Sequence, residues 1–286
     1  MIVAKRRLST VDHAPDVVGM TYVYPVVSRR AGGVSIGVNL NPNNACNWRC
    51  AYCQVEGLTL GAGPAIDLAK LERELTAMLD DVVNGDFLER STPEGARVLR
   101  DVAFAGNGEP TTSPEFAEAV DVTGRVMERF GLVGTLPVVL ITNGSQVKKS
   151  DVAAGLARLK EIGGRVWFKL DTATTEGMAR LNHAPGDPAT HLAKLRAAAA
   201  ICPTWIQTCL FAWDGAPPPE SELSAYLQAI RDLVHDGTPL EGVLLYSVAR
   251  ASMQPEAEHV VSLDEAWLRR FAARIEEAGL PVKVTA

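Results

Sequence analysis

Three of the chain's five cysteines, Cys46, Cys50 and Cys53, stand close together in residues 39–57 with the spacing C-x3-C-x2-C. Thiolates placed this close can hold three irons of a cubane [4Fe–4S] cluster, because such clusters are normally ligated by cysteine sulfur. A fourth cysteine would complete the ligand set, and none lies nearby in the sequence. One iron would therefore stay open to a ligand that the protein does not supply.

Other uses of these cysteines fit the sequence less well. A structural zinc site needs four ligands, and neither a second C-x2-C pair nor a C…H pair follows at finger spacing. A disulfide framework is uncommon in a chain of 286 residues with five cysteines. Buried, unreactive cysteines are common in proteins. Packing nevertheless does not explain three of them within eight positions of a loop rich in Pro, Asn and Gly.

The cysteine segment resembles the signature of the radical S-adenosylmethionine superfamily, Cys-x3-Cys-x-aromatic-Cys, with Tyr52 as the aromatic residue before Cys53. The phrases YPVVSRRAGGVSIGVNLNP, YCQVEG, GNGEPT, ITNGS and KLDTAT occur in this order. They are similar to a bacterial branch of these enzymes that is distantly related to wyosine-type tRNA-modifying synthases, and the similarity covers most of the chain. The resemblance implies a partial (β/α)6 TIM-like barrel, with a [4Fe–4S] cluster and S-adenosyl-L-methionine as cofactors.

The resemblance also implies the reaction type. The open iron would take the amine and carboxylate of S-adenosylmethionine, and the reduced cluster would cleave the cofactor to a 5′-deoxyadenosyl radical that abstracts hydrogen from a substrate. In this interpretation Cys46, Cys50 and Cys53 are both the metal ligands and the catalytic residues. The sequence does not identify the step after hydrogen abstraction. Rearrangement, carbon–carbon bond formation and RNA-base modification are all compatible with the motifs.

Residues 106–110, GNGEP, resemble the superfamily's GGEP loop, with Asn107 inserted between Gly106 and Gly108. Glycines allow close backbone approach, and Glu109 could accept hydrogen bonds from the cofactor's ammonium group. A turn that merely precedes a helix is the alternative interpretation.

Four further residues are predicted to bind the cofactor. Asn143 in ITNGS is expected to hydrogen-bond it, although Asn-Gly also favours a plain turn. Lys169 and Asp171 occupy alternate positions of one strand and can point the same way. The lysine would balance the cofactor carboxylate, and the aspartate would hold ribose hydroxyls or substrate, with a salt-bridged strand end as the alternative. Tyr52 is expected near the adenine, or else packs within the loop.

The alternation of strand-like and helix-like segments predicts parallel strands joined by crossovers, although an open sheet is also compatible with the pattern. Catalytic residues of α/β barrels gather at the C-terminal ends of strands. The candidate residues follow or end predicted strands, which predicts one shared site. The expected strands are 34–40, 101–105, 137–142, 165–170, 204–211 and 242–248, with a short last one at 281–285. The expected helices are 67–83 with Asp67 as N-cap, 113–130 with Pro114 in its first position, 150–161, 189–200, 220–235 and 263–278.

Length and composition favour one large α/β domain, because barrels of this class often reach about 200–250 residues. We expect an N-terminal extension over residues 1–33 and a core over 34–286. The extension carries basic residues and is either an arm over the barrel mouth or a solvated tail; these residues are Lys5, Arg6, Arg7, Arg29 and Arg30.

The net charge of −6 does not favour nucleic-acid binding outside a local patch. The first ten residues lack the apolar run of a signal peptide, and no run of about eighteen apolar residues predicts a membrane span. We therefore expect a cytoplasmic protein without a membrane partner, where thiols stay reduced.

Several residues have two interpretations. Cys202 and Cys209 are predicted to be buried thiols, and His183 is either a substrate contact or a surface residue. Arg250 is expected to face the barrel mouth. Three tryptophans line the cavity or pack in the core; they are Trp48, Trp205 and Trp213.

The expected partners are a substrate, which is a small molecule, a tRNA or a protein, and a reducing partner such as flavodoxin or ferredoxin. Two rival functions stay open. One is an activase that places a glycyl radical on a partner protein. The other is a non-catalytic iron–sulfur or zinc-binding module, which would need no cofactor pocket.

Overall fold

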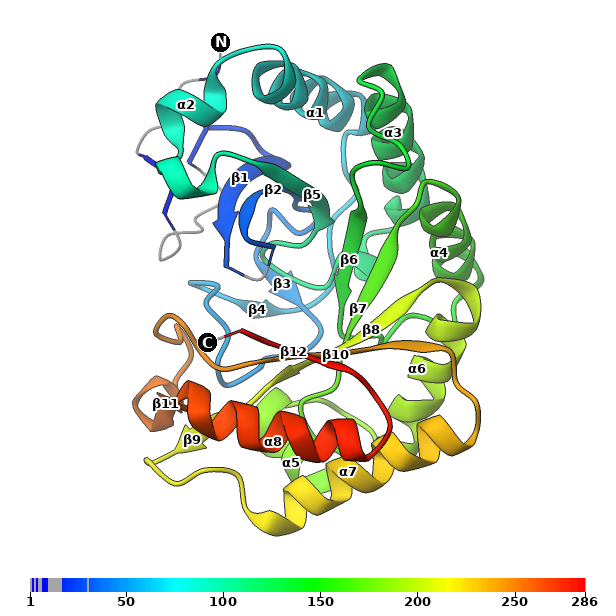
Figure 1. The fold of residues 1–286 in the computed structure, drawn as a ribbon. Helices are drawn as coiled ribbons and strands as arrows, with labels where there is room; N and C mark the ends of the chain where they lie inside the picture. The colour runs from blue at the N-terminus through cyan, green and yellow to red at the C-terminus, as the bar shows by residue number, and fades with distance from the viewer. Residues whose placement is uncertain (1, 3, 5–6, 10–16, 30, 286) are drawn as a thin grey trace.

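The computed structural model describes residues 2, 4, 7–9, 17–29 and 31–285. The strands of its main sheet are β1 Val23–Ser28, β2 Gly33–Val38, β5 Leu99–Phe104, β6 Val138–Thr142, β7 Arg165–Lys169, β8 Thr204–Cys209, β10 Leu240–Tyr246 and β12 Val282–Thr285. They lie side by side in the order β1-β2-β5-β6-β7-β8-β10-β12. Neighbours from β2 to β12 pair in parallel, whereas β1 is antiparallel to β2. The sheet curls into a partial barrel (Figure 1), which confirms the predicted fold.

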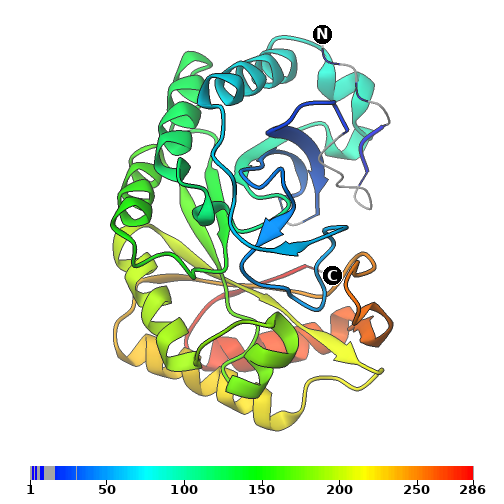
Figure 2. The same cartoon turned by 180° about the vertical axis from the view of Figure 1, so that it is seen from behind.

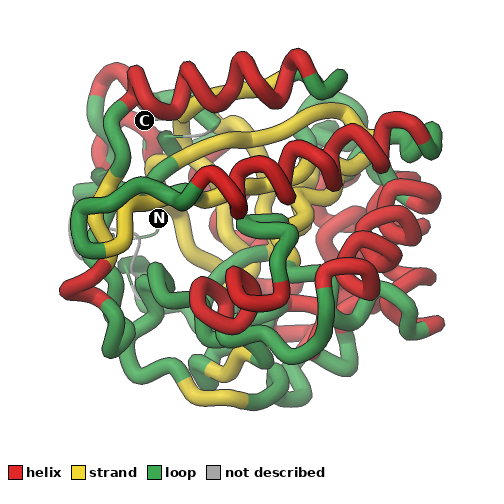
Figure 3. The backbone as a smooth tube through the Cα atoms, turned by 90° about the horizontal axis from the view of Figure 1, so that it is seen from below, coloured by secondary structure: helices red, strands yellow, loops and turns green. Residues whose placement is uncertain are grey.

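Helices connect the parallel strands and cover the outer side of the curled sheet (Figures 1 and 2). Seen from below, they flank the strands (Figure 3). Within the described residues, none of these helices has the length and apolar character needed to cross a membrane. Their bounds are α1 Leu68–Val83, α2 Phe87–Ser91, α3 Phe116–Arg129, α4 Ser150–Glu161, α5 Thr175–Gly177, α6 Pro188–Ile201, α7 Glu220–His235 and α8 Glu265–Glu277.

Helix α1 illustrates how the sequence positions the helices. Leu71, Leu75 and Met78 recur three or four residues apart and are fully buried, so they form one apolar face against the sheet. Asp67 caps the helix as predicted, because its Oδ1 accepts a hydrogen bond of 2.9 Å from the backbone N–H of Lys70. The cysteine segment lies between the end of β2 and α1, and α1 is held in position by this apolar face and its N-cap.

Strand β1 was not predicted from the sequence. It contains Pro25, which fits a strand only at a sheet edge, where its missing N–H is not needed. Tyr24 pairs with Gly37 of β2, and a Cβ on that glycine would lie 2.2 Å from the tyrosine ring. The glycine therefore lets the Tyr24 ring lie flat against β2, where it lines the inside of the barrel.

The predicted boundary after residue 33 stays a prediction. Of the basic residues before it, Lys5, Arg6 and Arg30 lie outside the described residues. Arg7 donates a hydrogen bond of 3.3 Å to the carbonyl at the end of α2, and Arg29 lines the central cavity.

Helix α3 begins later than predicted. It starts at Phe116, so Pro114 is not its first residue. The preceding residues form a separate 3-10 turn, Pro110–Thr112, because Glu109 accepts a hydrogen bond from the backbone N–H of Thr111 and caps that turn. Strand β10 also differs from the prediction, because it begins and ends two residues earlier than expected. Its pairing register with β8 shifts between Leu240 and Gly242.

Side chains of β7 and β8 alternate between two environments. Val166, Phe168 and Ile206 are fully buried in the main apolar core beneath the helices. Trp167 and Lys169, between them on β7, point the other way and line the interior cavity. Two small ladders complete the fold near the cavity: β3 (Ala45–Cys46) with β4 (Thr59–Leu60), and β9 (Phe211–Trp213) with β11 (Val260–Ser262).

Candidate functional site

A cavity of about 830 Å³ opens at the C-terminal ends of the parallel strands. Its volume lies within the range of about 300–1,000 Å³ that is typical of small-molecule sites. Among the residues predicted to hold the cluster or the cofactor, Asp171 alone does not line it. The lining residues include Cys46, Cys50, Tyr52, Cys53, Gly106, Gly108, Glu109, Asn143 and Lys169.

The three cysteines of the loop all face this cavity but are largely shielded from solvent. Burial raises the pKa of Cys46 to about 11 and that of Cys50 to about 12, and it also raises the pKa of Cys53. Protonated thiols are weak nucleophiles at neutral pH, so the bare site does not suit nucleophilic cysteine catalysis. Metal binding would deprotonate these thiols.

The chemistry of the donor set fits an iron–sulfur cluster. Three thiols line one cavity, and cysteine sulfur is the usual ligand of a [4Fe–4S] cluster. In the part of the chain that the structure describes, no three His, Cys, Asp or Glu side chains converge closely enough to bind a single ion.

The GNGEP loop packs directly against the cysteine segment. A Cβ on Gly108 would lie 2.0 Å from the carbonyl oxygen of Ala45, and one on Gly106, with φ +142°, would lie 2.5 Å from Asn39 Oδ1. Both positions therefore require glycine. The predicted close backbone approach is made to the cysteine segment, and contact of this loop with the cofactor stays a prediction.

The carboxylate of Glu109 joins this loop to the end of β6. Its Oε1 accepts hydrogen bonds from the Thr111 hydroxyl at 2.5 Å and the Thr142 hydroxyl at 2.7 Å, and its Oε2 accepts one of 2.6 Å from the Asn143 N–H. Burial raises the pKa of Glu109, and these donors oppose the rise. The predicted bond from Glu109 to the cofactor ammonium would add to an already well-paired carboxylate.

The amide of Asn143 reaches the cysteine segment. Its Nδ2 donates to Asn47 Oδ1 at 2.8 Å, and its Oδ1 accepts from the Ser145 N–H at 2.9 Å. Asn47 Nδ2 in turn donates to the Ser145 hydroxyl at 2.6 Å. This closed set of bonds positions the loop between Cys46 and Cys50, and the predicted role of Asn143 in cofactor binding stays untested.

Lys169, Tyr52 and Asp171 form a buried polar chain. Lys169 Nζ donates to the Tyr52 hydroxyl at 2.5 Å, and that hydroxyl donates to Asp171 Oδ2 at 2.5 Å. Burial alone would lower the pKa of the Lys169 amine, but the Asp171 carboxylate raises it above its ordinary value. Burial and the same carboxylate raise the pKa of Tyr52. The chain therefore runs from the Lys169 amine through the Tyr52 phenol to the Asp171 carboxylate.

Asp171 lies behind the cavity wall and links three parts of the site. Its side chain is 0% exposed, and it accepts hydrogen bonds from Asn182 Nδ2 at 2.8 Å and from the Cys209 N–H at 2.9 Å. Asn182 also donates to Cys50 Sγ at 3.4 Å. These contacts favour the salt-bridged strand end over a direct contact between Asp171 and the cofactor.

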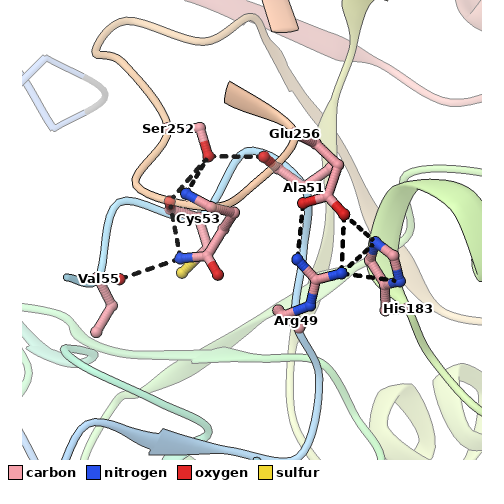
Figure 4. Close-up of polar contacts among 8 residues, drawn as sticks. Arg49, Ala51, Cys53, Val55, His183, Ser252 and Glu256 are labelled. Atoms are coloured by element: carbon pink, nitrogen blue, oxygen red, sulfur yellow. Dashed lines mark hydrogen bonds and ion pairs between the residues drawn. The ribbon is translucent and has the colours of Figure 1, made fainter. Parts of the chain in front are cut away.

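Residues 249–259, which follow β10 and are called the clasp here, lie against the cysteine segment (Figure 4). The Ser252 hydroxyl donates to the Ala51 carbonyl at 2.7 Å and to the Cys53 carbonyl at 3.2 Å. The Met253 N–H also donates to Cys53, at 2.8 Å. The clasp thereby satisfies carbonyls of the loop that carries the cysteines.

An ion pair fixes the far end of the clasp. Arg49 donates to both carboxylate oxygens of Glu256, at 2.7 and 2.8 Å, and His183 Nε2 lies 3.0 Å from Glu256 Oε1 (Figure 4). The hydrogen bond from Arg49 lowers the pKa of Glu256. His183, for which the sequence left two interpretations, therefore belongs to this cluster and has a side chain that is 34% exposed.

We expect acid to loosen the clasp. The pKa of Glu256 is lowered in the fold, so its stabilising contribution is present above the ordinary carboxyl pKa and is lost as pH falls through the lower, folded value. Glu256→Gln should weaken the clasp at neutral pH by about 1 kcal/mol, a usual value for a partly exposed, hydrogen-bonded ion pair. Hydrogen exchange of the Met253 amide, corrected for its intrinsic rate, measures this opening.

The matched control is Glu258→Gln on the same short helical turn, where the side chain is 82% exposed. This variant should leave the exchange of the Met253 amide unchanged. Equal protection in Glu256→Gln and in the unmodified chain would contradict the role of the ion pair.

Cys202 and Cys209 are both 1% exposed, which confirms that they are buried thiols. Cys209 also lines the cavity, as does Arg250.

The three tryptophans have different surroundings. Trp48 lines the cavity and packs against His191 with ring centroids 5.3 Å apart. Trp205 is 8% exposed, and the amine of Lys283 lies over its ring. Trp213 stacks on His259 at 5.4 Å, outside the cavity lining.

The residues that hold the cysteine segment from distant parts of the chain could not be recognised in the sequence. Their partners are up to 207 residues away in the sequence, so no local spacing connects them. The missed residues are Asn47, Arg49, Asn182, Ser252 and Glu256.

Solved structures share this fold at low sequence identity. A radical SAM methyltransferase from Sphaerobacter thermophilus matches with TM-score 0.58 and 14% identity, over 88% of this chain and 66% of that one. TYW1 with a lysine-pyruvate adduct bound matches with TM-score 0.54 and 15% identity, over 86% and 74%. A spore photoproduct lyase double mutant with bound AdoMet and dinucleoside spore photoproduct matches with TM-score 0.55 and 13% identity, over 88% and 76%. At these identities the likeness concerns the fold alone.

No protein-family model matches the chain. Among curated proteins, GTPase Obg from Brachyspira hyodysenteriae (strain ATCC 49526 / WA1) is 27% identical over 135 residues, which are 46% of this chain and 17% of that protein. The chain thus spans less than a fifth of that protein's length. The G-x4-G-K-[ST] nucleotide-binding motif does not occur in the present sequence.

Proposed function

From its radical S-adenosylmethionine fold, we propose that the protein is an enzyme that holds a [4Fe–4S] cluster on Cys46, Cys50 and Cys53 and binds S-adenosylmethionine beside it. The single observation that carries this proposal is that these three thiols line one cavity together with the GNGEP loop, Asn143 and Lys169. The bound cluster and cofactor would supply a 5′-deoxyadenosyl radical for hydrogen abstraction.

The chain's own residues have positioning and shielding tasks in this proposal. The clasp and the bonds of Asn143 to Asn47 hold the cysteine loop. Lys169 keeps a buried positive charge at the cavity wall, where it can attract the cofactor carboxylate. Gly106, Gly108 and Glu109 would meet the cofactor's amine end. The buried thiols favour a reducing cytoplasm, and a flavodoxin or ferredoxin would supply the electron.

The test is anaerobic reconstitution with iron and sulfide, reduction with dithionite and addition of S-adenosylmethionine. We expect about four irons per chain, as one cubane requires, and formation of 5′-deoxyadenosine. Zinc in place of iron would contradict the proposal. Full iron loading without any 5′-deoxyadenosine would mean either that cleavage waits for the substrate or that the chain is a non-catalytic binding module.

A further inference from the structure

The cavity wall contains a buried side-chain amide nitrogen for which the described residues supply no hydrogen-bond partner. Gln207 of β8 is 1% exposed, lines the cavity, and has no hydrogen-bond partner for its Nε2 among the described residues. Buried polar groups in folded proteins are nearly always paired, so such an exception needs an explanation. The other unpaired buried atoms of the described chain belong to residues outside this cavity's lining; they are Thr76, Thr92, Ser113, Arg158 and Arg165.

The position of Gln207 places the amide next to the proposed reaction centre. In the register of β7 and β8, Gln207 pairs with Lys169, whose Nζ donates to Tyr52 of the cysteine loop. The amide therefore stands beside Lys169 on the neighbouring strand. Trp167 lies two residues before Lys169 on β7, nearer the N-terminal end of the strand, and lines the same cavity.

A carboxylate on β5 belongs to the same cavity lining. Asp101 of β5 is 5% exposed, lines the cavity, and accepts a hydrogen bond from the Ser35 hydroxyl. A flat indole, an amide donor and a carboxylate thus face one space, which we call the inner chamber. Aromatic rings bind planar groups, amide N–H groups bind carbonyl oxygens, and a carboxylate accepts hydrogen bonds.

We propose that the inner chamber is the substrate subsite and that it takes a small, planar molecule with a carbonyl oxygen, which Gln207 Nε2 binds while the ring lies against Trp167. The reactive role of this subsite rests on the proposed function, whereas ligand binding does not. The substrate is a small molecule because the cavity of about 830 Å³ must also contain the cluster and the cofactor.

The first test measures the melting temperature of the full chain with Gln207→Met. The measurement is made once after reconstitution with iron and once without iron. Methionine has a similar shape and no polar atom that needs a partner, so the melting temperature should rise, by about 2–4 °C. The control is Gln228→Met on α7, where Nε2 already bonds Asp232 at 2.8 Å and the residue is exposed; its melting temperature should not rise. A lower melting temperature in Gln207→Met would show a structural amide and overturn the proposal.

The second test measures binding with benzamide, which is planar and has a carbonyl oxygen, and with toluene, which has a similar ring without one. Benzamide should quench tryptophan fluorescence saturably in the unmodified chain, with at least about tenfold weaker binding in Gln207→Met. Toluene should not distinguish the two proteins. Equal binding of benzamide to both, or no binding of benzamide to the unmodified chain, would overturn the subsite.

Both tests can be read without any cofactor cleavage, so their failure is distinguishable from failure of the proposed function. A tRNA that binds the chain with steep salt dependence, while benzamide does not bind, would replace the small-molecule class by a nucleic acid.

Discussion

Cys50→Ala is expected to lose cluster iron on reconstitution and to reduce 5′-deoxyadenosine formation to background. Cys50 is the most deeply buried cysteine of the loop, 9% exposed, and the Asn182 amide lies 3.4 Å from its sulfur. Changes outside the ligand shell already cost about 10- to 100-fold in metal affinity or activity. Loss of a ligand should cost more, and iron analysis with product chromatography measures both quantities.

The matched control is Cys202→Ala. Cys202 is equally a buried thiol, 1% exposed, but its sulfur lies near the carbonyl of Gly164 and outside the cavity lining. Both variants remove one buried sulfur, so any general loss of packing is shared. Iron content and product should stay near the unmodified level in Cys202→Ala. Equal losses in the two variants would mean that the cysteine loop has no special role.

The fold could be predicted because its signals are local. Leu71 and Leu75 recur at helical spacing, Asp67 stands where an N-cap belongs, and each parallel strand follows its helix. Strand β1 escaped prediction because Pro25 and the basic residues around it are typical of a loop, and the sequence gives no sign that the strand lies at a sheet edge.

The candidate site could be predicted as a set of residues but not as a set of contacts. Spacing identified the cysteines, and position after a strand identified Asn143. Their actual partners depend on how distant segments meet, as with Arg49 and Glu256, which are 207 residues apart. The structure adds that several predicted cofactor residues hydrogen-bond the cysteine loop or each other, which positions the loop before any cofactor binds.

Asp171→Ala is expected to destabilise the fold by about 3–5 kcal/mol, the usual cost of removing one partner of a buried ion pair. The change leaves the Lys169 cation without its anion and removes the acceptor for three donors, from Tyr52, Asn182 and Cys209. Urea denaturation measures the loss. Asp171→Asn should also destabilise, because it preserves the shape but not the charge.

The double variant Asp171→Ala/Lys169→Met decides whether charge pairing is the cause. Removing both charges leaves no buried ion unpaired, so the double variant should be more stable than Asp171→Ala alone. Lys169→Met alone should be destabilised too, because it strands the carboxylate. If the double variant is instead less stable than Asp171→Ala by the full effect of Lys169→Met, the two residues act independently. The carboxylate would then matter for its hydrogen bonds to Tyr52 and Asn182 and not for its charge. The positive charge of Lys169 at the cavity wall would then not depend on Asp171.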